Sequence, residues 1–72
     1  MKIIWKEITE EISVGEVVKC QYDVFAAANI DAAGEYLGTY FEDNDDDEMW
    51  SLIAEYEREG YQLMPSIWKE AE

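Results

Sequence analysis

Residues 18–24, VKCQYDV, alternate two kinds of side chain without a break. A repeat of two is the period of a β-strand, in which successive side chains point to opposite faces. The segment is therefore predicted to be a strand with one buried face and one solvated face. One face would carry Val18, Cys20, Tyr22 and Val24, and the other Lys19, Gln21 and Asp23.

The segment before this strand, KIIWKEITEEI, fits two interpretations. Ile4, Ile8 and Ile12 recur at helical spacing, whereas the apolar cluster IIW followed by Ile8 also suits a strand. The tetrapeptide SVGE after it is expected to be a turn, because Gly15 tolerates a positive φ. We favour a strand at about residues 2–11, paired with the strand described above in a hairpin.

Residues 29–41, NIDAAGEYLGTYF, are predicted to form a first helix. Asn29 suits the N-cap, and Asp31 lies in the first turn, where the helix dipole favours an anion. Gly34 and Gly38 each cost about 1 kcal/mol relative to alanine inside a helix. Either they let the backbone lie close to the sheet, or Gly38 ends the helix. The inward stripe would consist of Ile30, Ala33, Leu37 and either Tyr40 or Phe41.

A second helix is predicted to begin within the acidic run that follows. Asp45 and Glu48 have the spacing of a capping box, with Asp in place of the usual Ser or Thr. Gly60 is expected to end this helix. Its inward face would carry Met49, Ile53 and Tyr56, with Trp50 and Leu52 at the margins.

The last segment, YQLMPSIWK, is predicted to be a strand with Tyr61, Leu63 and Ile67 on one face. Pro65 cannot donate a ladder hydrogen bond, so this strand should lie at a sheet edge or contain a bulge. The predicted fold is a small α+β domain that spans residues 1–72, in the order β-β-α-α-β. Two helices would pack on one face of an antiparallel sheet.

The sequence lacks the residues that common catalytic and metal sites need. It contains no histidine to serve as the base for a serine or cysteine nucleophile. Asp43, Asp45 and Asp47 match the first three ligand positions of an EF-hand loop, but Glu48 stands where glycine is needed and Ala54 where glutamate is needed. We therefore expect a protein without enzymatic activity, cofactor or bound metal.

The net charge of −13 limits the kinds of partner. Such a chain should be repelled by nucleic acid itself and by anionic lipid, so basic proteins or cations are the expected partners. The lone Cys20 can form no intramolecular disulfide, which fits a reducing bacterial cytoplasm. Neither a signal peptide nor an apolar stretch of membrane-spanning length is recognisable.

Most of the acidic residues lie in one part of the chain. Residues 31–59 contain eleven acidic residues and one basic residue, and residues 42–48 alone contain six carboxylates. A charge run of this kind is either a solvated loop or a binding surface. Two acidic helix edges joined by an acidic turn would place negative charges at distances comparable to those along a nucleic-acid backbone. The expected partner-binding residues are Asp31, Glu35, Glu42, Asp43, Asp45, Asp46, Asp47, Glu48, Trp50 and Glu55.

Two tryptophans near the ends of this region have alternative roles. Trp50 and Trp68 are both expected to lie at least partly in the core, because tryptophan supplies much of the buried area in a domain this small. Trp50, beside the acidic run, could instead anchor an interface surrounded by charges.

In its size, acidity, lone cysteine and the run EDNDDDE, the chain resembles the small acidic inhibitor proteins of phages and mobile elements, particularly anti-CRISPR and anti-restriction proteins. The resemblance implies inhibition by nucleic-acid mimicry. The acidic surface would occupy the DNA- or RNA-binding groove of a basic host protein, for example a CRISPR effector subunit. The alternative is an immunity protein or antitoxin that neutralises one basic toxin, such as a nuclease, through an aromatic-anchored interface.

Overall fold

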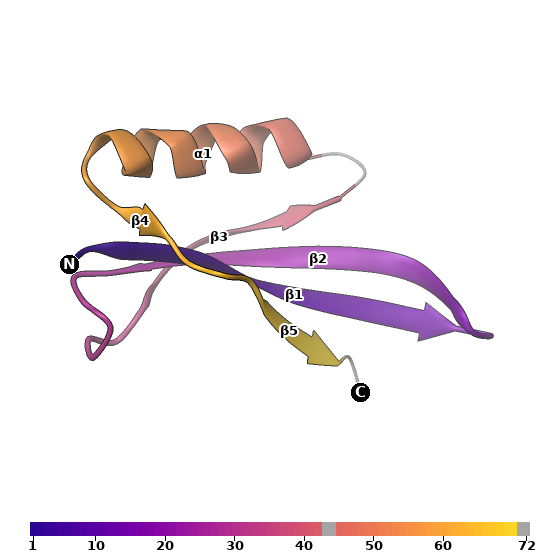
Figure 1. The fold of residues 1–72 in the computed structure, drawn as a ribbon. Helices are drawn as coiled ribbons and strands as arrows, with labels where there is room; N and C mark the ends of the chain where they lie inside the picture. Colours follow the sequence, from indigo (N-terminus) through magenta and orange to yellow (C-terminus); the bar gives the residue numbers. More distant parts are fainter. Residues whose placement is uncertain (43–44, 71–72) are drawn as a thin grey trace.

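The computed structural model describes residues 1–42 and 45–70. Within these ranges the chain forms five strands and one helix (Figure 1). The strands form one sheet in the order β3-β2-β1-β4, and β5 also pairs with β1. The elements are β1 (Ile3–Ser13), β2 (Glu16–Ala27), β3 (Glu35–Phe41), α1 (Asp46–Arg58), β4 (Gln62–Leu63) and β5 (Ile67–Glu70).

The strands β1 and β2 form the long hairpin that the sequence predicts. They pair antiparallel along their whole length, with a register shift near the turn. Val14 and Gly15 connect them with positive φ angles of 53° and 77°, the combination that a type I′ turn requires. The side chain of Val18 lies outside the described part of the structure. The predicted alternation is confirmed for the rest of the inward set, since the side of β2 that faces α1 carries Cys20, Tyr22 and Val24.

The predicted helix over residues 29–41 is wrong. Residues 28–34 form a loop, and the rest of the segment is β3, antiparallel to β2. Asn29 does accept a hydrogen bond from the backbone N–H of Asp31, at 2.9 Å, but this bond closes an Asx turn after which the chain becomes extended. Cross-strand packing favours the strand, because the rings of Phe25 and Tyr36 lie 5.7 Å apart.

Gly34 lies where this loop meets the sheet. A Cβ atom at this position would lie 2.7 Å from Cη2 of Trp5 and 2.9 Å from Cζ2. The indole of Trp5 therefore packs directly on the Gly34 backbone, and it also stacks on Phe25 with ring centroids 5.7 Å apart. The prediction that Gly34 allows close approach to the sheet is confirmed, although the helix that was to contain it does not form.

The C-terminal segment forms two short strands. Both β4 and β5 run parallel to β1, so the sheet is mixed, whereas an antiparallel sheet was predicted. The predicted edge position is confirmed, and the pairing is interrupted around Pro65. Leu63 packs against the core under α1, whereas Ile67 lies beside Ile3 and Trp5 on the other side of the sheet. The predicted common face for Leu63 and Ile67 is therefore wrong.

The helix α1 begins at Asp46, within the acidic run as predicted. Asp45 occupies the N-cap position but makes no side-chain capping bond, so the predicted capping box with Glu48 does not form. The Asp45 carboxylate instead accepts a hydrogen bond from the backbone N–H of Phe41 at 3.3 Å. Asp45 thereby closes the turn that joins β3 to the helix.

The C-terminal end of α1 is a Schellman motif with the predicted glycine. Gly60 has a φ of 98°, and its N–H donates to the carbonyl of Glu57 at 3.1 Å. The N–H of Tyr61 donates to the carbonyl of Tyr56, also at 3.1 Å, and the two tyrosine rings meet edge to face at 4.9 Å. This combination of two backbone bonds and one apolar contact is a recurrent way to end a helix.

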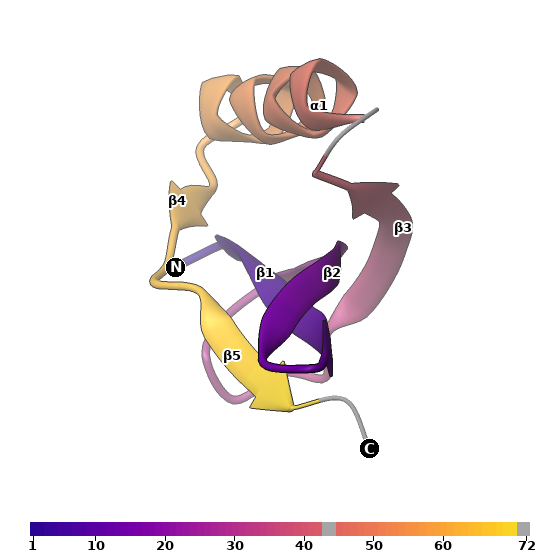
Figure 2. The same ribbon diagram turned by 90° about the vertical axis from the view of Figure 1, so that its right-hand side faces the viewer.

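The core lies between α1 and one face of the sheet, with β3 and β4 on either side of the helix (Figure 2). Its buried residues are Ile4, Val24, Ala26, Met49 and Ile53. The predicted β-β-α-α-β fold with two helices is therefore wrong, since the described residues form a mostly antiparallel sheet with a single short helix. Among those residues, no helix has the length and apolarity that a membrane span would need.

Candidate functional site

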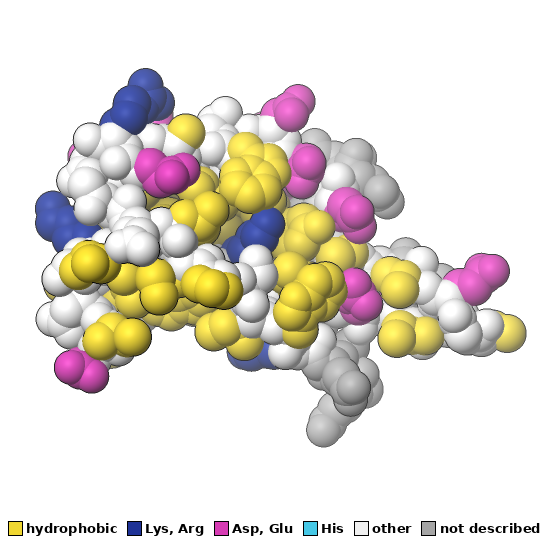
Figure 3. Space-filling model, viewed as in Figure 1, with side chains coloured by type: hydrophobic (Ala, Val, Ile, Leu, Met, Phe, Trp, Pro, Cys, Tyr) yellow, Lys and Arg dark blue, Asp and Glu magenta, His cyan; other side chains and the backbone are white. Residues whose placement is uncertain are grey.

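The helix α1 carries carboxylates on both of its flanks. Met49 and Ile53 define the buried side of the helix, and each residue is rotated by about 100° from the one before. On this geometry one flank carries Glu48, Glu55 and Glu59, and the other carries Asp46 and Glu57. We call these five exposed residues the acidic flanks of α1. Figure 3 shows Asp and Glu side chains around the helix and at the far end of the hairpin.

The acidic residues at the start of α1 also stabilise the helix itself. Asp46, Asp47 and Glu48 lie in the first turn, where each carboxylate contributes about 0.3–1 kcal/mol through the helix dipole. Asp45, which closes the preceding turn, is half-buried. Removing these charges would therefore lower the stability of the helix as well as change any binding surface.

The remaining predicted acidic residues lie in three places. Glu35 begins β3 and lies close to Tyr56 of α1. The pKa of Tyr56 is raised first by its burial and then by the charge of Glu35. Glu42 follows β3, and its N–H donates to the carbonyl of Cys20 at 3.2 Å. Asp31 is exposed in the 28–34 loop, on the side of the sheet away from α1 (Figure 1).

The predicted site is thus only partly assembled. The structure brings together, on the side of α1, Glu35, Glu42, Asp45, Asp46, Asp47, Glu48, Trp50 and Glu55. Asp31 does not belong to this surface, and Asp43 lies outside the described residues.

Trp50 lies at the edge between α1 and the sheet. Its side chain remains 43% exposed. The Nζ atom of Lys6 lies 4.3 Å from the centroid of the Trp50 ring and 5.2 Å from that of Tyr22. Lys6 therefore makes cation–π contacts with two rings on the acidic side of the molecule.

Trp68 is not a core residue, contrary to the sequence-based expectation, since it is 66% exposed. It lies opposite Ile8 in the parallel β5–β1 pair. Ile8 in turn lies opposite Tyr22, and Tyr22 opposite Tyr40. Residues in register on neighbouring strands share a face, so these four residues form a row across the sheet on the side of α1. We call Trp68, Ile8, Tyr22 and Tyr40 the aromatic row.

Carboxylates lie next to the aromatic row, two residues further along the strands. Glu10 lies opposite Cys20, and Glu42 is hydrogen-bonded to the backbone of Cys20. Burial raises the pKa of the Cys20 thiol, and the Glu42 and Glu10 charges raise it further. Burial and the nearby Cys20, Glu42 and Asp46 also raise the pKa of Tyr22. The strand register and the backbone bond of Glu42 thus place Glu10 and Glu42 next to the aromatic row.

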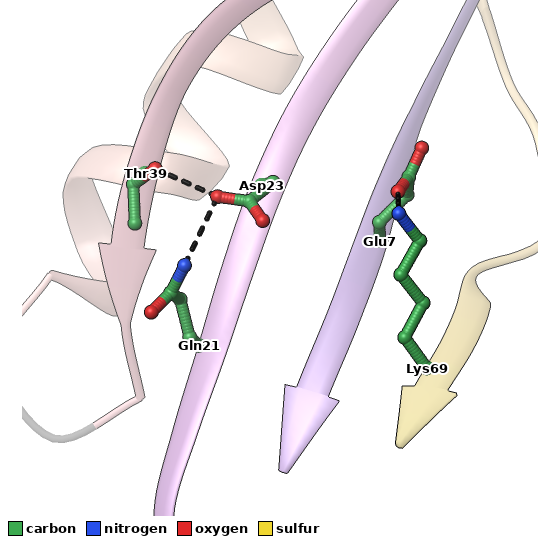
Figure 4. Close-up of polar contacts among 5 residues, drawn as sticks. All are labelled: Glu7, Gln21, Asp23, Thr39 and Lys69. Carbon is green, nitrogen blue, oxygen red and sulfur yellow. Dashed lines mark hydrogen bonds and ion pairs between the residues drawn. The ribbon is translucent and has the colours of Figure 1, made fainter. Parts of the chain in front are cut away.

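On the face of the sheet that points away from α1, here called the open face, two carboxylates have polar partners within the chain (Figure 4). Lys69 on β5 forms an ion pair with Glu7 on β1. Asp23 accepts hydrogen bonds from the Thr39 hydroxyl at 2.7 Å and from the Gln21 amide at 3.3 Å. These groups are therefore already satisfied within the chain.

The open face also has an apolar hollow of about 280 Å³ near the start of β1. The 28–34 loop forms one wall and the β4–β5 segment the other. The indole N–H of Trp5 is buried and has no acceptor among the described residues. The residues that line the hollow are Ile3, Trp5, Ile30, Met64, Pro65 and Ile67.

In residues 1–42 and 45–70 no three side chains of the metal-ligating types are grouped to hold an ion. Comparisons with known proteins give no match to a family model, to a curated protein or to a solved structure. The candidate site therefore rests on the geometry of the acidic flanks and of the aromatic row. Glu10 and the exposed Trp68 were not predicted as site residues, and the alternation of strand β5 was too short to show that Trp68 is exposed.

Proposed function

We propose that the chain is a non-enzymatic protein that inhibits a nucleic-acid-binding protein or complex, of the kind that anti-CRISPR and anti-restriction proteins inhibit. The acidic flanks of α1 occupy the basic groove of that target in place of nucleic acid. The observation that carries the proposal is the pair of exposed carboxylate rows on α1. The single ion pair among the described residues, Glu7 with Lys69, lies elsewhere, so the flanks retain their charge for a partner.

The dimensions of α1 fit this role. An α-helix with its side chains is about 10–12 Å wide, so the two flanks lie about as far apart as the two sides of the major groove, which is about 12 Å wide. With 13 residues, α1 is about 20 Å long, the length of about six base pairs. Within one flank, Glu55 and Glu59 are separated by about 6 Å along the axis. A groove lined with lysine and arginine would attract such a surface by the electrostatics that it uses for DNA.

A second candidate function is that of an immunity protein or antitoxin bound to one basic toxin. It is favoured by the exposure of Trp50 and Trp68 on the same side as the acidic flanks. Exposed tryptophans surrounded by charged residues are frequent centres of binding energy in shape-specific protein interfaces.

The experiment that tests the first proposal compares two triple variants with equal loss of charge. Glu48→Gln, Glu55→Gln and Glu59→Gln together remove one acidic flank and take only one carboxylate, that of Glu48, from the first turn of the helix. The matched control is Glu11→Gln, Glu16→Gln and Asp31→Asn, which removes three exposed carboxylates that lie away from α1 and from the aromatic row. The wild-type chain is immobilised, a bacterial lysate is applied, and the captured protein is eluted by a salt gradient.

The flank variant should bind the captured protein roughly tenfold more weakly, because three exposed ion pairs of about 0.5 kcal/mol each contribute about 1.5 kcal/mol together. The control should retain most of the affinity. Duplex DNA should displace the captured protein if the flanks mimic nucleic acid, whereas an immunity-type interface should lose more affinity on Trp68→Ala than on loss of the flank. Equal effects of the two triple variants would show that only net charge matters and would refute the proposed role of α1.

A further inference from the structure

We infer that the aromatic row and the carboxylates beside it form a subsite for an arginine side chain of the basic partner. The inference deepens the proposed function, because it names the side chain that the partner inserts. It rests on the proposed function for the class of the partner. The first observation is the exposure of Trp68, a residue that is 66% exposed although it lies beside the buried Ile8. An indole ring exposed to this degree offers a flat, uncovered surface.

The chain itself shows that cations stack on this side of the molecule. The ammonium group of Lys6 lies 4.3 Å from the centroid of Trp50 and 5.2 Å from that of Tyr22. Tyr22 belongs to the aromatic row, so one member of the row already contacts a cation. Trp68, at the other end of the row, has no comparable cation among the described residues.

The neighbouring carboxylates supply the complementary charge. Glu10 is two residues beyond Ile8 on the same face of β1, about 7 Å along the strand. Glu42 lies on the same side of the row as Glu10, beyond Cys20, and the charges of Glu42 and Asp46 act on Tyr22. A guanidinium stacked on Trp68 therefore has a carboxylate within reach of its N–H groups. Among the described residues on this face, Lys6 contacts Tyr22 of the row, whereas Lys2, at the other end of β1, contacts Tyr61 instead.

Arginine fits this arrangement better than lysine does. Its planar guanidinium can stack on an indole and at the same time donate two parallel hydrogen bonds to a carboxylate. The ammonium of lysine is a strongly hydrated point charge that cannot do both in one plane. Basic grooves that bind nucleic acid are rich in arginine, so the chemistry of the subsite matches the partner class of the proposed function.

The test uses the full chain and two probes of equal charge, a triarginine peptide and a trilysine peptide. Binding is followed by NMR, through the indole N–H signals, and by tryptophan fluorescence. Wild-type chain should bind triarginine roughly two- to fivefold more tightly than trilysine, the ratio that corresponds to about 0.5–1 kcal/mol. Trp68→Ala should abolish this preference while weak binding of both peptides by charge remains.

The matched control is Ile67→Ala, which changes a neighbouring residue of β5 on the open face and should keep the preference. Equal affinity of wild-type chain for the two peptides overturns the inference, and so does a preference that survives in Trp68→Ala. The wild-type comparison needs no variant, so it remains decisive even if Trp68→Ala is unstable. The peptide test contains no captured protein and leaves α1 unchanged, so its failure is distinct from failure of the flank variant.

Discussion

The contact between Trp5 and Gly34 offers a direct test of how the 28–34 loop is held against the sheet. Gly34 does not have a positive φ, so Gly34→Ala would ordinarily stabilise the chain by about 0.4–1 kcal/mol through the unfolded state. Here the new Cβ would lie 2.7 Å from Cη2 of Trp5, whereas ordinary contacts begin at 3.4 Å. The indole would have to move away, and its stacking on Phe25 restrains it.

The expected effect is a net loss of stability. Overpacking of this kind costs about 1–3 kcal/mol, which exceeds the gain from the unfolded state and leaves a net destabilisation of about 1–2 kcal/mol. In a domain of this size each kcal/mol corresponds to a change in Tm of about 4–8 °C. Urea denaturation followed by circular dichroism, together with a thermal melt, measures both quantities. The denaturant slope m should stay unchanged, because the surface exposed on unfolding is the same.

A double-mutant cycle with Trp5→Leu isolates the contact. The leucine side chain does not reach Gly34 as the indole does, so Gly34→Ala should cost less in the Trp5→Leu background than in the wild type. If Gly34→Ala is neutral or stabilising in the wild type, or if its cost is the same in both backgrounds, the steric argument is wrong.

Three further predictions concern stability. Val14→Asn should stabilise the chain by about 1 kcal/mol in urea denaturation, because Val14 is fully exposed with a φ of 53° and asparagine suits the first position of a type I′ turn; an unchanged or lower stability would contradict this. Added NaCl should raise the Tm, because it screens the repulsion within a chain of net charge −13; a fall in Tm would count against this. Burial raises the pKa of Tyr22 above its ordinary 10.0, so the contribution of Tyr22 to the free energy of unfolding is complete below pH 10.0 and is lost as the pH rises further. Above pH 10.0 the Tm should therefore fall more steeply with pH in the wild type than in Tyr22→Phe, and an equal fall in both would contradict this.

The parts of the fold that the sequence predicts are those with strong local signals. The alternation of residues 18–24 identified β2, and Gly60 marked the end of α1, since both signals depend on neighbouring residues only. The helix predicted over residues 29–41 was wrong because Asn29 makes the same local hydrogen bond in an Asx turn as in a helix N-cap. The aromatic residues of YLGTYF favoured a strand and its glycine counted against a helix, but the contact between the Phe25 and Tyr36 rings that fixes the strand is a tertiary contact.

The candidate site shows the same division. Glu48 and Glu55 could be assigned to one surface from their helical spacing, because α1 was predicted correctly. Asp31 was misplaced together with the helix that was to carry it. Trp68 could not be recognised as exposed, because a tryptophan in a short strand is as compatible with a core as with a surface, and its position depends on the parallel pairing of β5 with β1.

The loss of one predicted helix changes how mimicry can work. Two acidic helices would have formed one charged array, whereas a single helix presents two flanks and places the aromatic row beside them. The charged part of such an interface weakens as salt rises, since exposed ion pairs are screened within about 8 Å at physiological ionic strength. Stacking on Trp68 is less sensitive to salt, because it also depends on burial of the ring. Affinity that remains at high salt should therefore be lost on Trp68→Ala, whereas affinity that salt removes should depend on the acidic flanks. A partner whose binding disappears completely with salt, and is indifferent to Trp68, would show that the flanks act alone.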